Sequence, residues 1–383
     1  MALHFTADEF DRRRARALQA MAARRLDALL MFKQESMYWL TGYDSFGYCF
    51  FQCLVLRADG EIVLLTRAPD LRQAQNTSII TDIRIWVDRE GATPADDLKD
   101  LLRLGGLEGK RLGIEYDATG LTAARGKQVD AALDGFAAAE DASDLVARQR
   151  LIKSEAELAY VRRAAELADE ALDAAIGTTR AGADEGDILA AMQGAVFRGG
   201  GDYPGNPFII GSGPDALLCR YKSGRRKLDP QDQLTLEYAG VYRQYHACLM
   251  NTFVIGETSP HQRKMFEAAS EALLACEAAL KPGTAMGEVF DTHAAVMDGH
   301  GMQAHRLNAC GYSLGTVYAP CWMDWPMFYT GNPVVIEPGM VFFLHMILMD
   351  SDAGQAMCLG RTSVVTDLGA DVLSKAPLDL VVR

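Results

Sequence analysis

The chain has 383 residues, of which 49% are hydrophobic and 23% charged, a balance that is typical of globular proteins and excludes a disordered chain. This length predicts two domains rather than one core. The net charge of −13 argues against a nucleic-acid partner, and no apolar run reaches the roughly 18–20 residues of a membrane span.

The cysteines and the first residues of the chain indicate the cellular compartment. The eight cysteines are scattered without a Cys-x-x-Cys pair, which argues against a zinc ribbon or a redox motif. Residues 1–6 have no basic segment followed by an apolar one, as a signal sequence would. We therefore expect reduced thiols in a cytoplasmic protein.

The first half of the chain alternates helical and strand patterns. A capping-box pattern at residues 6–9 predicts the start of the first helix. Strands are predicted where apolar runs lie between turn residues, at 28–32, 53–56, 62–65 and 111–115. Together these segments predict an α/β domain over residues 1–150.

The pattern changes after residue 150. A second capping box, at 154–157, opens a long amphipathic helix. Further helices are predicted at 261–280 and 286–300, and strands at 234–255, 341–348 and 361–366. Because helices are segregated from antiparallel strands, we expect an α+β domain over residues 151–383.

One motif resembles a serine hydrolase signature. Residues 311–315 match the Gly-x-Ser-x-Gly nucleophile elbow, which requires a helix directly after the serine. Residues 317–322 cannot begin a helix. We therefore do not expect Ser313 to be a nucleophile.

Four segments carry recognisable motifs: the helix opening at 151–155, the end of a hairpin at 251–256, and the turns at 281–283 and 337–341. Together they resemble the creatinase/aminopeptidase P/methionine aminopeptidase family. The resemblance extends over nearly the whole chain. It implies a pita-bread domain over residues 151–383, behind an α/β domain over residues 1–150, and a homodimer.

The resemblance also implies where metal ligands would lie. The family's peptidases hold two divalent metals with two aspartates, one histidine and two glutamates, ligands that suit manganese, cobalt, iron or zinc. In this chain their places are taken by Glu237, Cys248, Tyr312, His345 and Gly360. Glycine has no side chain that could bind a metal, and the phenol of a tyrosine is a poor substitute for imidazole as a metal ligand. We therefore predict no metal and no cofactor, which argues against peptidase activity.

A metal-independent branch of the family gives the best match. Residues 237–248 and 200–204, with Trp322 and His345, resemble bacterial ectoine hydrolases. In that group a glutamate in the place of Glu237 is implicated in opening a cyclic amidine.

Two departures leave the substrate open. The ectoine hydrolases keep a histidine where this chain has Arg220. Creatinase, the other metal-free relative, has a catalytic histidine and two glutamates that would fall on Arg220, Met250 and His345. The chain therefore does not match creatinase.

Strand alternation predicts which side chains share a cavity. If Cys248 faces it, His246 does too, and Glu237, Tyr312 and His345 complete the cluster with Arg220 at its edge. Hydrolysis of a C–N bond needs a nucleophile, a proton for the leaving nitrogen and a counter to developing charge.

We assign roles to these side chains accordingly. Glu237 is the nucleophile or the base for a water, and His345 shuttles a proton because its unperturbed pKa lies near neutrality. Tyr312 and His246 orient the substrate, and Arg220 binds its carboxylate.

Each role has a structural alternative. Glu237 can instead be an ion-pair partner of Arg220 or Arg243. His345 can be hydrogen-bonded core, and Tyr312 can fill the volume of the missing metals. Cys248 is either a small core residue or, paired with His345, the nucleophile.

Aromatic residues are further candidates for substrate binding. Trp322 belongs to an aromatic cluster at 322–329 that either packs or cradles a cationic substrate. Tyr203 lies in the segment that resembles ectoine hydrolases. The resemblance suggests that Phe46, in the first domain, reaches the site of a partner subunit.

The predicted function is a metal-independent hydrolase that cleaves a C–N bond in a small carboxylate-bearing cyclic amidine, guanidino compound or cyclic amide. Three alternatives stay open: a lyase acting on a small zwitterion, an Xaa-Pro peptidase-like enzyme, and an inactive pita-bread binding module. The retained polar residues of the cavity favour an enzyme.

Overall fold

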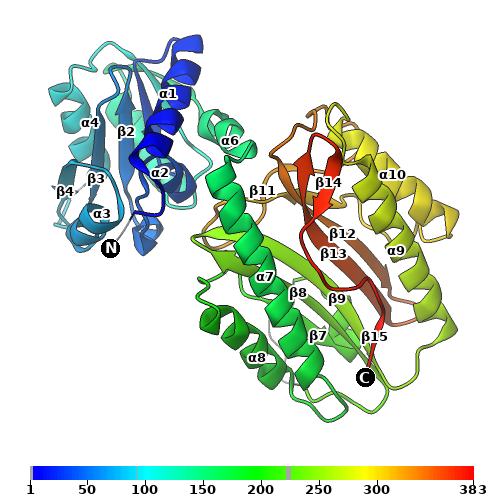
Figure 1. The fold of residues 1–383 in the computed structure, drawn as a ribbon. Helices are drawn as coiled ribbons and strands as arrows, with labels where there is room; N and C mark the ends of the chain where they lie inside the picture. The colour runs from blue at the N-terminus through cyan, green and yellow to red at the C-terminus, as the bar shows by residue number, and fades with distance from the viewer. Residues whose placement is uncertain (1–2, 92, 221–225) are drawn as a thin grey trace. The chain divides into compact units, whose positions relative to one another are not determined.

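The computed structural model describes residues 3–91, 93–220 and 226–383. The chain divides into two compact units, Met1–Arg150 and Leu151–Arg383, and each has its own sheet (Figure 1). Among the helices of the described residues, none is both long and apolar enough to cross a membrane.

The first unit has a mixed six-stranded sheet in the order β4-β3-β2-β1-β5-β6. Its strands are β1 (Ala28–Met31), β2 (Cys53–Arg57), β3 (Ile62–Arg67), β4 (Asp82–Trp86), β5 (Arg111–Ile114) and β6 (Ala138–Asp141). Its helices are α1 (Ala7–Ala23), α2 (Gln34–Thr41), α3 (Leu71–Thr77), α4 (Pro94–Leu104), α5 (Ala123–Leu133) and α6 (Ser143–Leu151), with short 3-10 turns η1 (Phe46–Cys49) and η2 (Ala68–Asp70).

The central strand β1 is apolar throughout because both faces of its sheet are covered. Leu30 joins an apolar cluster with Leu98 of α4 and Val129 of α5. Leu29, which points the other way, joins a second cluster with Ala17 of α1. A strand buried on both faces reads as a continuous apolar run rather than an alternating one.

The second unit has a nine-stranded sheet, whose main path runs β11-β10-β12-β13-β9-β8-β7. Its strands are β7 (Ile209–Ser212), β8 (Asp232–Tyr242), β9 (Tyr245–Ile255), β10 (Gly311–Ser313), β11 (Asp324–Met327), β12 (Val341–Asp350), β13 (Gln355–Thr366), β14 (Gly369–Val372) and β15 (Val381–Val382). Its helices are α7 (Glu155–Thr178), α8 (Glu185–Arg198), α9 (Pro260–Ala279) and α10 (Met286–Gly299), and a 3-10 turn, η3 (Gly213–Leu217), follows β7.

Both predicted capping boxes lie at helix N-termini. The hydroxyl of Thr6 accepts the backbone N–H of Glu9, and α1 follows. In α7, Ser154 and Glu157 bond each other's backbone N–H groups reciprocally. Glu157 also accepts the hydroxyl of Tyr245 at 2.7 Å, so the cap fixes the start of α7 against β9.

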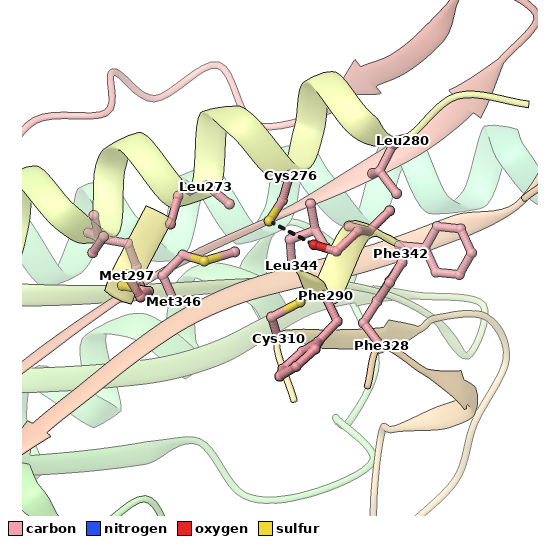
Figure 2. Packing of buried hydrophobic residues seen from close by; sticks show 14 of the residues in the cluster. Leu273, Cys276, Leu280, Phe290, Met297, Cys310, Phe328, Phe342, Leu344 and Met346 are labelled. Atoms are coloured by element: carbon pink, nitrogen blue, oxygen red, sulfur yellow. Dashed lines mark hydrogen bonds between the residues drawn. The ribbon is translucent and has the colours of Figure 1, made fainter. Parts of the chain in front are cut away.

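The sheet of the second unit has one face packed on helices. Phe342, Leu344 and Met346 of β12 join a large apolar cluster with residues of α9 and α10 (Figure 2). Because side chains alternate along a strand, Phe343 and His345 point to the opposite face.

Strand β8 likewise has one face packed on a helix and one face turned away from it. Gly240 lies so close to α7 that an added Cβ would come within 1.9 Å of the carbonyl oxygen of Ala164. Glu237 and Ala239, at odd positions of the strand, therefore face away from α7. The face without helices is where the candidate residues gather.

Candidate active site

A row of aligned residues crosses four strands on the helix-free face. Glu237 of β8 pairs with Met250 of β9, Met250 pairs with Gly360 of β13, and Gly360 pairs with His345 of β12. Two strands thus separate Glu237 from His345. The gap between them is bridged by Tyr312 of β10, which is paired with Phe343 on the far side of β12.

Tyr312 links the two ends of this row. Its hydroxyl donates to Oε1 of Glu237 at 3.2 Å, and its ring lies 5.6 Å from the ring of His345. The indole Nε1 of Trp322 donates to the same hydroxyl at 2.8 Å. An indole N–H only donates, so the phenol accepts from Trp322 and directs its own proton to Glu237.

Glu237 has the protonation properties of a general acid–base group. Burial raises the pKa of Glu237 to about 7, although the Tyr312 hydrogen bond and the charge of Arg220 lower it. Burial also holds the pKa of Tyr312 well above its usual value, so the phenol stays a donor. Glu237 forms no ion pair within the described residues, so the structure does not contain the ion pair with Arg220 or Arg243 that was its structural alternative.

Arg220 follows η3 and lies at the edge of the site. Its side chain is exposed, and its charge lowers the pKa of both Glu237 and His345. Within the described part of the chain, Arg220 has no ion-pair partner. A guanidinium placed in this way is suited to bind an incoming carboxylate.

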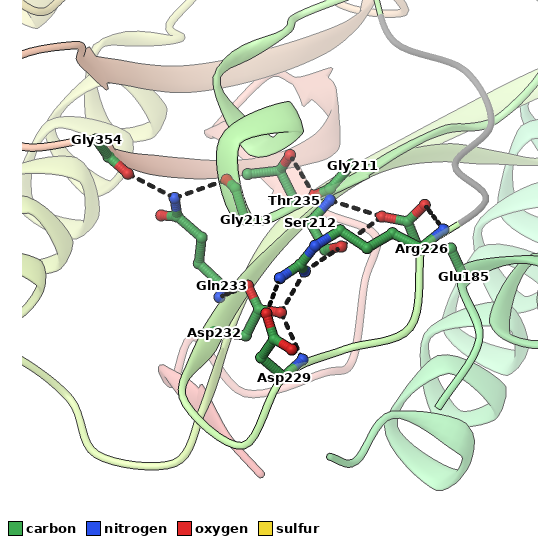
Figure 3. A network of polar contacts seen from close by, with 10 residues as sticks. All are labelled: Glu185, Gly211, Ser212, Gly213, Arg226, Asp229, Asp232, Gln233, Thr235 and Gly354. Carbon is green, nitrogen blue, oxygen red and sulfur yellow. Dashed lines mark hydrogen bonds and ion pairs between the residues drawn. The ribbon is translucent and has the colours of Figure 1, made fainter. Parts of the chain in front are cut away.

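A buried polar network holds both ends of the segment that carries Arg220 (Figure 3). At one end, Glu185 accepts the backbone N–H of Ser212 at 2.8 Å and its hydroxyl at 2.5 Å. At the other end, Arg226 donates to the Ser212 hydroxyl at 2.9 Å and pairs with Asp232.

His345 is more deeply buried than its proposed shuttle role requires. Burial lowers its pKa to about 3, and the nearby His293 and Arg220 contribute to the same shift. The pKa of His345 is therefore far below the unperturbed value on which the shuttle role was based, because desolvation disfavours the imidazolium. The Nδ1 atom of His345 has no hydrogen-bond partner within the described residues, which leaves it available to a bound molecule.

Cys248 is a buried thiol rather than a poised nucleophile. Its backbone N–H donates to the Thr362 hydroxyl at 2.8 Å, which holds β9 against β13. Burial and the carboxylate of Glu237 raise its pKa well above 9, so the reactive thiolate is disfavoured.

Both ring nitrogens of His246 form hydrogen bonds with backbone groups. Its Nε2 accepts the N–H of Gly205 at 2.8 Å, and its Nδ1 donates to the carbonyl of Gln244 at 2.9 Å. Neither nitrogen is left for a substrate. The side chain instead holds the loop in which Asn206 accepts the backbone N–H of Trp322 at 3.2 Å.

Two predicted substrate-binding residues lie outside this cluster. Tyr203 is 79% exposed, and its ring lies 4.9 Å from Phe197 at the end of α8. Phe46 is 74% exposed in the first unit, where its ring lies 5.9 Å from that of Tyr48. Their predicted roles stay predictions.

A pocket beside Glu237 is not predictable from residue patterns along the chain. Met250, Ile347 and Cys358 line it, together with Cys219 from the segment after β7. These residues read as ordinary apolar strand positions. Only the cross-strand register, which pairs Ile347 with Cys358, reveals that they share one pocket.

The second unit is a curled antiparallel half-barrel, the pita-bread fold, and the first is a mixed α/β sheet domain, so the predicted fold class is confirmed. Residues 159–367 match metallopeptidase family M24, and residues 13–152 match the creatinase/prolidase N-terminal domain. The chain belongs to family M24 and is a hydrolase of that family.

Distant relatives match the full length of the chain. An uncharacterized hydrolase/peptidase from Sinorhizobium fredii is 28% identical over 100% of this chain and 99% of the relative. An ectoine hydrolase from Halomonas elongata is 26% identical, again over 100% and 99%. The structure of a dipeptidase from Mycobacterium ulcerans superposes with a TM-score of 0.85, at 22% identity over 99% of both chains.

The family name implies a metal centre, which the residues of this chain do not fit. Of the five positions expected to bear ligands, Gly360 has no side chain, and the hydroxyl of Tyr312 is already bonded to Glu237. Across the residues that the structure describes, no three His, Cys, Asp or Glu side chains form a group able to hold a metal ion. The described residues at these positions therefore do not form the metal centre that the family name implies.

Proposed function

We propose that this protein hydrolyses a C–N bond in a small carboxylate-bearing molecule without a metal ion. Cyclic amidines, guanidino acids and cyclic amides all have such bonds. The observation that carries the proposal is Glu237, which is half-buried, has a pKa raised to about 7 and is held by Tyr312 on a sheet face that does not fit metals. The similarity to an ectoine hydrolase supports it.

In the proposed reaction Glu237 acts first as base and then as acid. It takes a proton from water while the water oxygen bonds to the carbon of the C–N bond. The protonated carboxyl then donates that proton to the nitrogen as the C–N bond breaks, so that one water has been added. A pKa near the working pH suits both steps. Direct attack by the carboxylate is the alternative.

The neighbouring residues position this carboxyl and the substrate. Trp322 and Tyr312 orient the carboxylate through their directed hydrogen bonds. The neutral imidazole of His345 offers its unpartnered Nδ1 to the substrate. Arg220 binds the substrate carboxylate, because its planar fork suits bidentate pairing.

Cys248 is the weaker candidate for the nucleophile. Its thiol would have to lose a proton in an environment that raises its pKa well above 9. No hydrogen bond from this thiol to His345 is present within the described residues. A Cys–His mechanism needs such a partner to generate the thiolate.

The proposed assembly is a homodimer, as the family resemblance implies. In that assembly the exposed rings of Tyr203 and Phe46 are available to close a site around the substrate. We propose no nucleic-acid or membrane partner.

The test is a substrate panel on metal-analysed protein. Purified protein is incubated with ectoine, hydroxyectoine, creatine and Xaa-Pro dipeptides, with and without a chelator. We expect turnover of a cyclic or guanidino compound that a chelator does not reduce, and none of the dipeptides. Dipeptide cleavage restored by manganese would establish the peptidase alternative, and elimination products without added water would establish the lyase.

Variants separate an enzyme from a binding module. Glu237→Gln should abolish turnover, whereas Glu271→Gln, on the exposed side of α9, should leave it unchanged. If no panel compound is turned over and Glu237→Gln binds the same compounds as tightly as the parent, the protein is a binding module.

A further inference from the structure

A loop at residues 201–206, in the connection between α8 and β7, is anchored on the hairpin of β8 and β9. The backbone N–H of Asp202 donates to the carbonyl of Val241 in β8 at 3.0 Å. The backbone N–H of Gly205 donates to Nε2 of His246 in β9 at 2.8 Å. Each strand of the hairpin therefore holds one end of the loop.

The imidazole of His246 is suited to this anchoring role. It is fully buried, and its Nδ1 donates to the carbonyl of Gln244 at 2.9 Å, which leaves Nε2 as the acceptor. Burial lowers the pKa of His246 to about 4, so the ring is neutral near pH 7 and Nε2 can accept. Without this acceptor the buried N–H of Gly205 would lose its partner, which is unfavourable enough to displace the loop.

The loop in turn fixes the backbone of Trp322. Gly205 lies so close to it that an added Cβ would come within 3.0 Å of the N and Cα atoms of Trp322. The next residue, Asn206, accepts the backbone N–H of Trp322 at 3.2 Å through its side-chain oxygen. The close contact and the hydrogen bond together determine where the buried indole lies.

Trp322 connects this loop to the candidate active site. Its Nε1 donates to the hydroxyl of Tyr312 at 2.8 Å, and that hydroxyl donates to Glu237 at 3.2 Å. Because an indole N–H only donates, the position of the indole determines where the phenol directs its own proton. A continuous series of contacts therefore runs from His246 through the loop, Trp322 and Tyr312 to Glu237.

We propose that His246 is a positioning residue for Glu237, which acts through the loop at 201–206 and Trp322. This inference rests on the proposed function and adds to it. His246, Gly205 and Asn206 fix the geometry of the hydrogen bond by which Tyr312 directs the carboxylate. This geometry affects the rate because a displacement of about 1 Å at a reacting group can reduce it by about 100-fold.

The first test observes the indole of Trp322 and needs no substrate. The chain has four tryptophans, so ¹⁵N-tryptophan labelling gives four indole N–H resonances, and Trp322→Phe identifies the one from Trp322. His246→Phe keeps a ring but removes the acceptor and should shift this resonance, whereas His246→Gln keeps an acceptor and should restore it. Trp39 and Trp86, in the first unit, should not shift. An unchanged Trp322 resonance in folded His246→Phe would overturn the inference.

A second variant covers the case in which His246→Phe does not fold. Gly205→Ala adds one methyl group against the Trp322 backbone and should shift the same resonance while His246 is intact. Gly177→Ala is the matched control, because a Cβ on Gly177 of α7 would meet no atom within 4 Å, and it should leave the resonance in place. An unchanged resonance in Gly205→Ala would also contradict the inference.

Steady-state kinetics on the substrate found by the panel is the second readout. His246→Phe and Gly205→Ala should lower kcat by up to about 100-fold and leave KM nearly unchanged, because Arg220 lies on another segment. His246→Gln should recover most of kcat, which a loss of stability alone would not explain.

The outcomes separate this inference from the proposed function. A shifted Trp322 resonance without turnover by the parent protein would support the link from His246 to Trp322 and contradict the hydrolase. Turnover by the parent that His246→Phe and Gly205→Ala leave unchanged would support the hydrolase and contradict the positioning role.

Discussion

The phenol of Tyr312 donates to the carboxylate of Glu237 at 3.2 Å while accepting from Trp322. The hydrogen bond stabilises the ionised carboxylate against the burial that raises its pKa. Tyr312 therefore sets both the direction and the acidity of Glu237.

Replacing Tyr312 by Phe should change the pH profile as well as the rate. We expect kcat to fall by about 10–100-fold, since hydrogen bonds to charged groups are worth roughly 1.5–3 kcal/mol. The acidic limb of kcat/KM should move to higher pH, because a stabilising bond to the ionised form is lost. A pH–rate profile on the substrate found by the panel measures both. Trp322→Phe should shift the limb less, and an unmoved limb in both variants would contradict the role given to Tyr312.

Replacing Glu237 by Gln should stabilise the fold at high pH while abolishing activity. The pKa of Glu237 is raised from 4.5 to about 7 by folding, so stability is lost as pH rises through this range. Gln removes that loss, which amounts to about 3 kcal/mol at about 1.4 kcal/mol per pKa unit. Denaturant unfolding at pH 5 and pH 8 checks this. A gain of equal size at both pH values would show that Glu237 titrates normally.

Acid should destabilise the protein through its buried histidines. Burial lowers the pKa of His246 and His293 to about 4 and that of His345 to about 3. Their contribution is present above about pH 6.5, where the unfolded chain is also neutral, and is lost as pH falls toward 4.

A single variant isolates one of these histidines. His293 is buried in α10, and its Nδ1 has no partner within the described residues. His293→Phe should therefore fold and should show a shallower loss of stability between pH 6.5 and 4, measured by denaturant unfolding. The same pH slope as the parent would contradict this role.

Arg220 should govern substrate binding more than turnover. Arg220→Met should raise KM by about 10–100-fold, the worth of a charge-assisted pair. Arg220→Lys should recover part of the loss, because a lysine keeps the charge but lacks the planar fork. Steady-state kinetics separates KM from kcat. A loss confined to kcat would show that Arg220 does not bind the carboxylate.

Arg226 should affect the same parameter without contacting substrate. It ties the segment of Arg220 to Ser212 and Asp232. We expect Arg226→Met to raise KM toward the value of Arg220→Met while leaving kcat nearly unchanged. If the double variant shows the sum of both effects, the two residues act independently.

Local chemistry made much of the fold predictable. The N-cap at Thr6, the capping box at Ser154, glycine-marked turns and continuous apolar strands depend on neighbours in sequence, and the structure contains them. The order of the motifs also predicted the family. The roles of Glu237 and Tyr312 and the expectation that no metal is bound stay predictions. Strand alternation correctly placed His345 on the face of Phe343, away from the apolar cluster.

Tertiary structure alone decided how these residues act. The sequence does not show that both ring nitrogens of His246 form hydrogen bonds with backbone groups of Gly205 and Gln244. It also does not show that burial lowers the pKa of His345 to about 3. It also cannot align Ile347 with Cys358 to form the pocket. The reason is that desolvation and hydrogen-bond partners are set by residues distant in the chain. Residue type and spacing determine which groups are available, and packing across the sheet determines their charge and their partners.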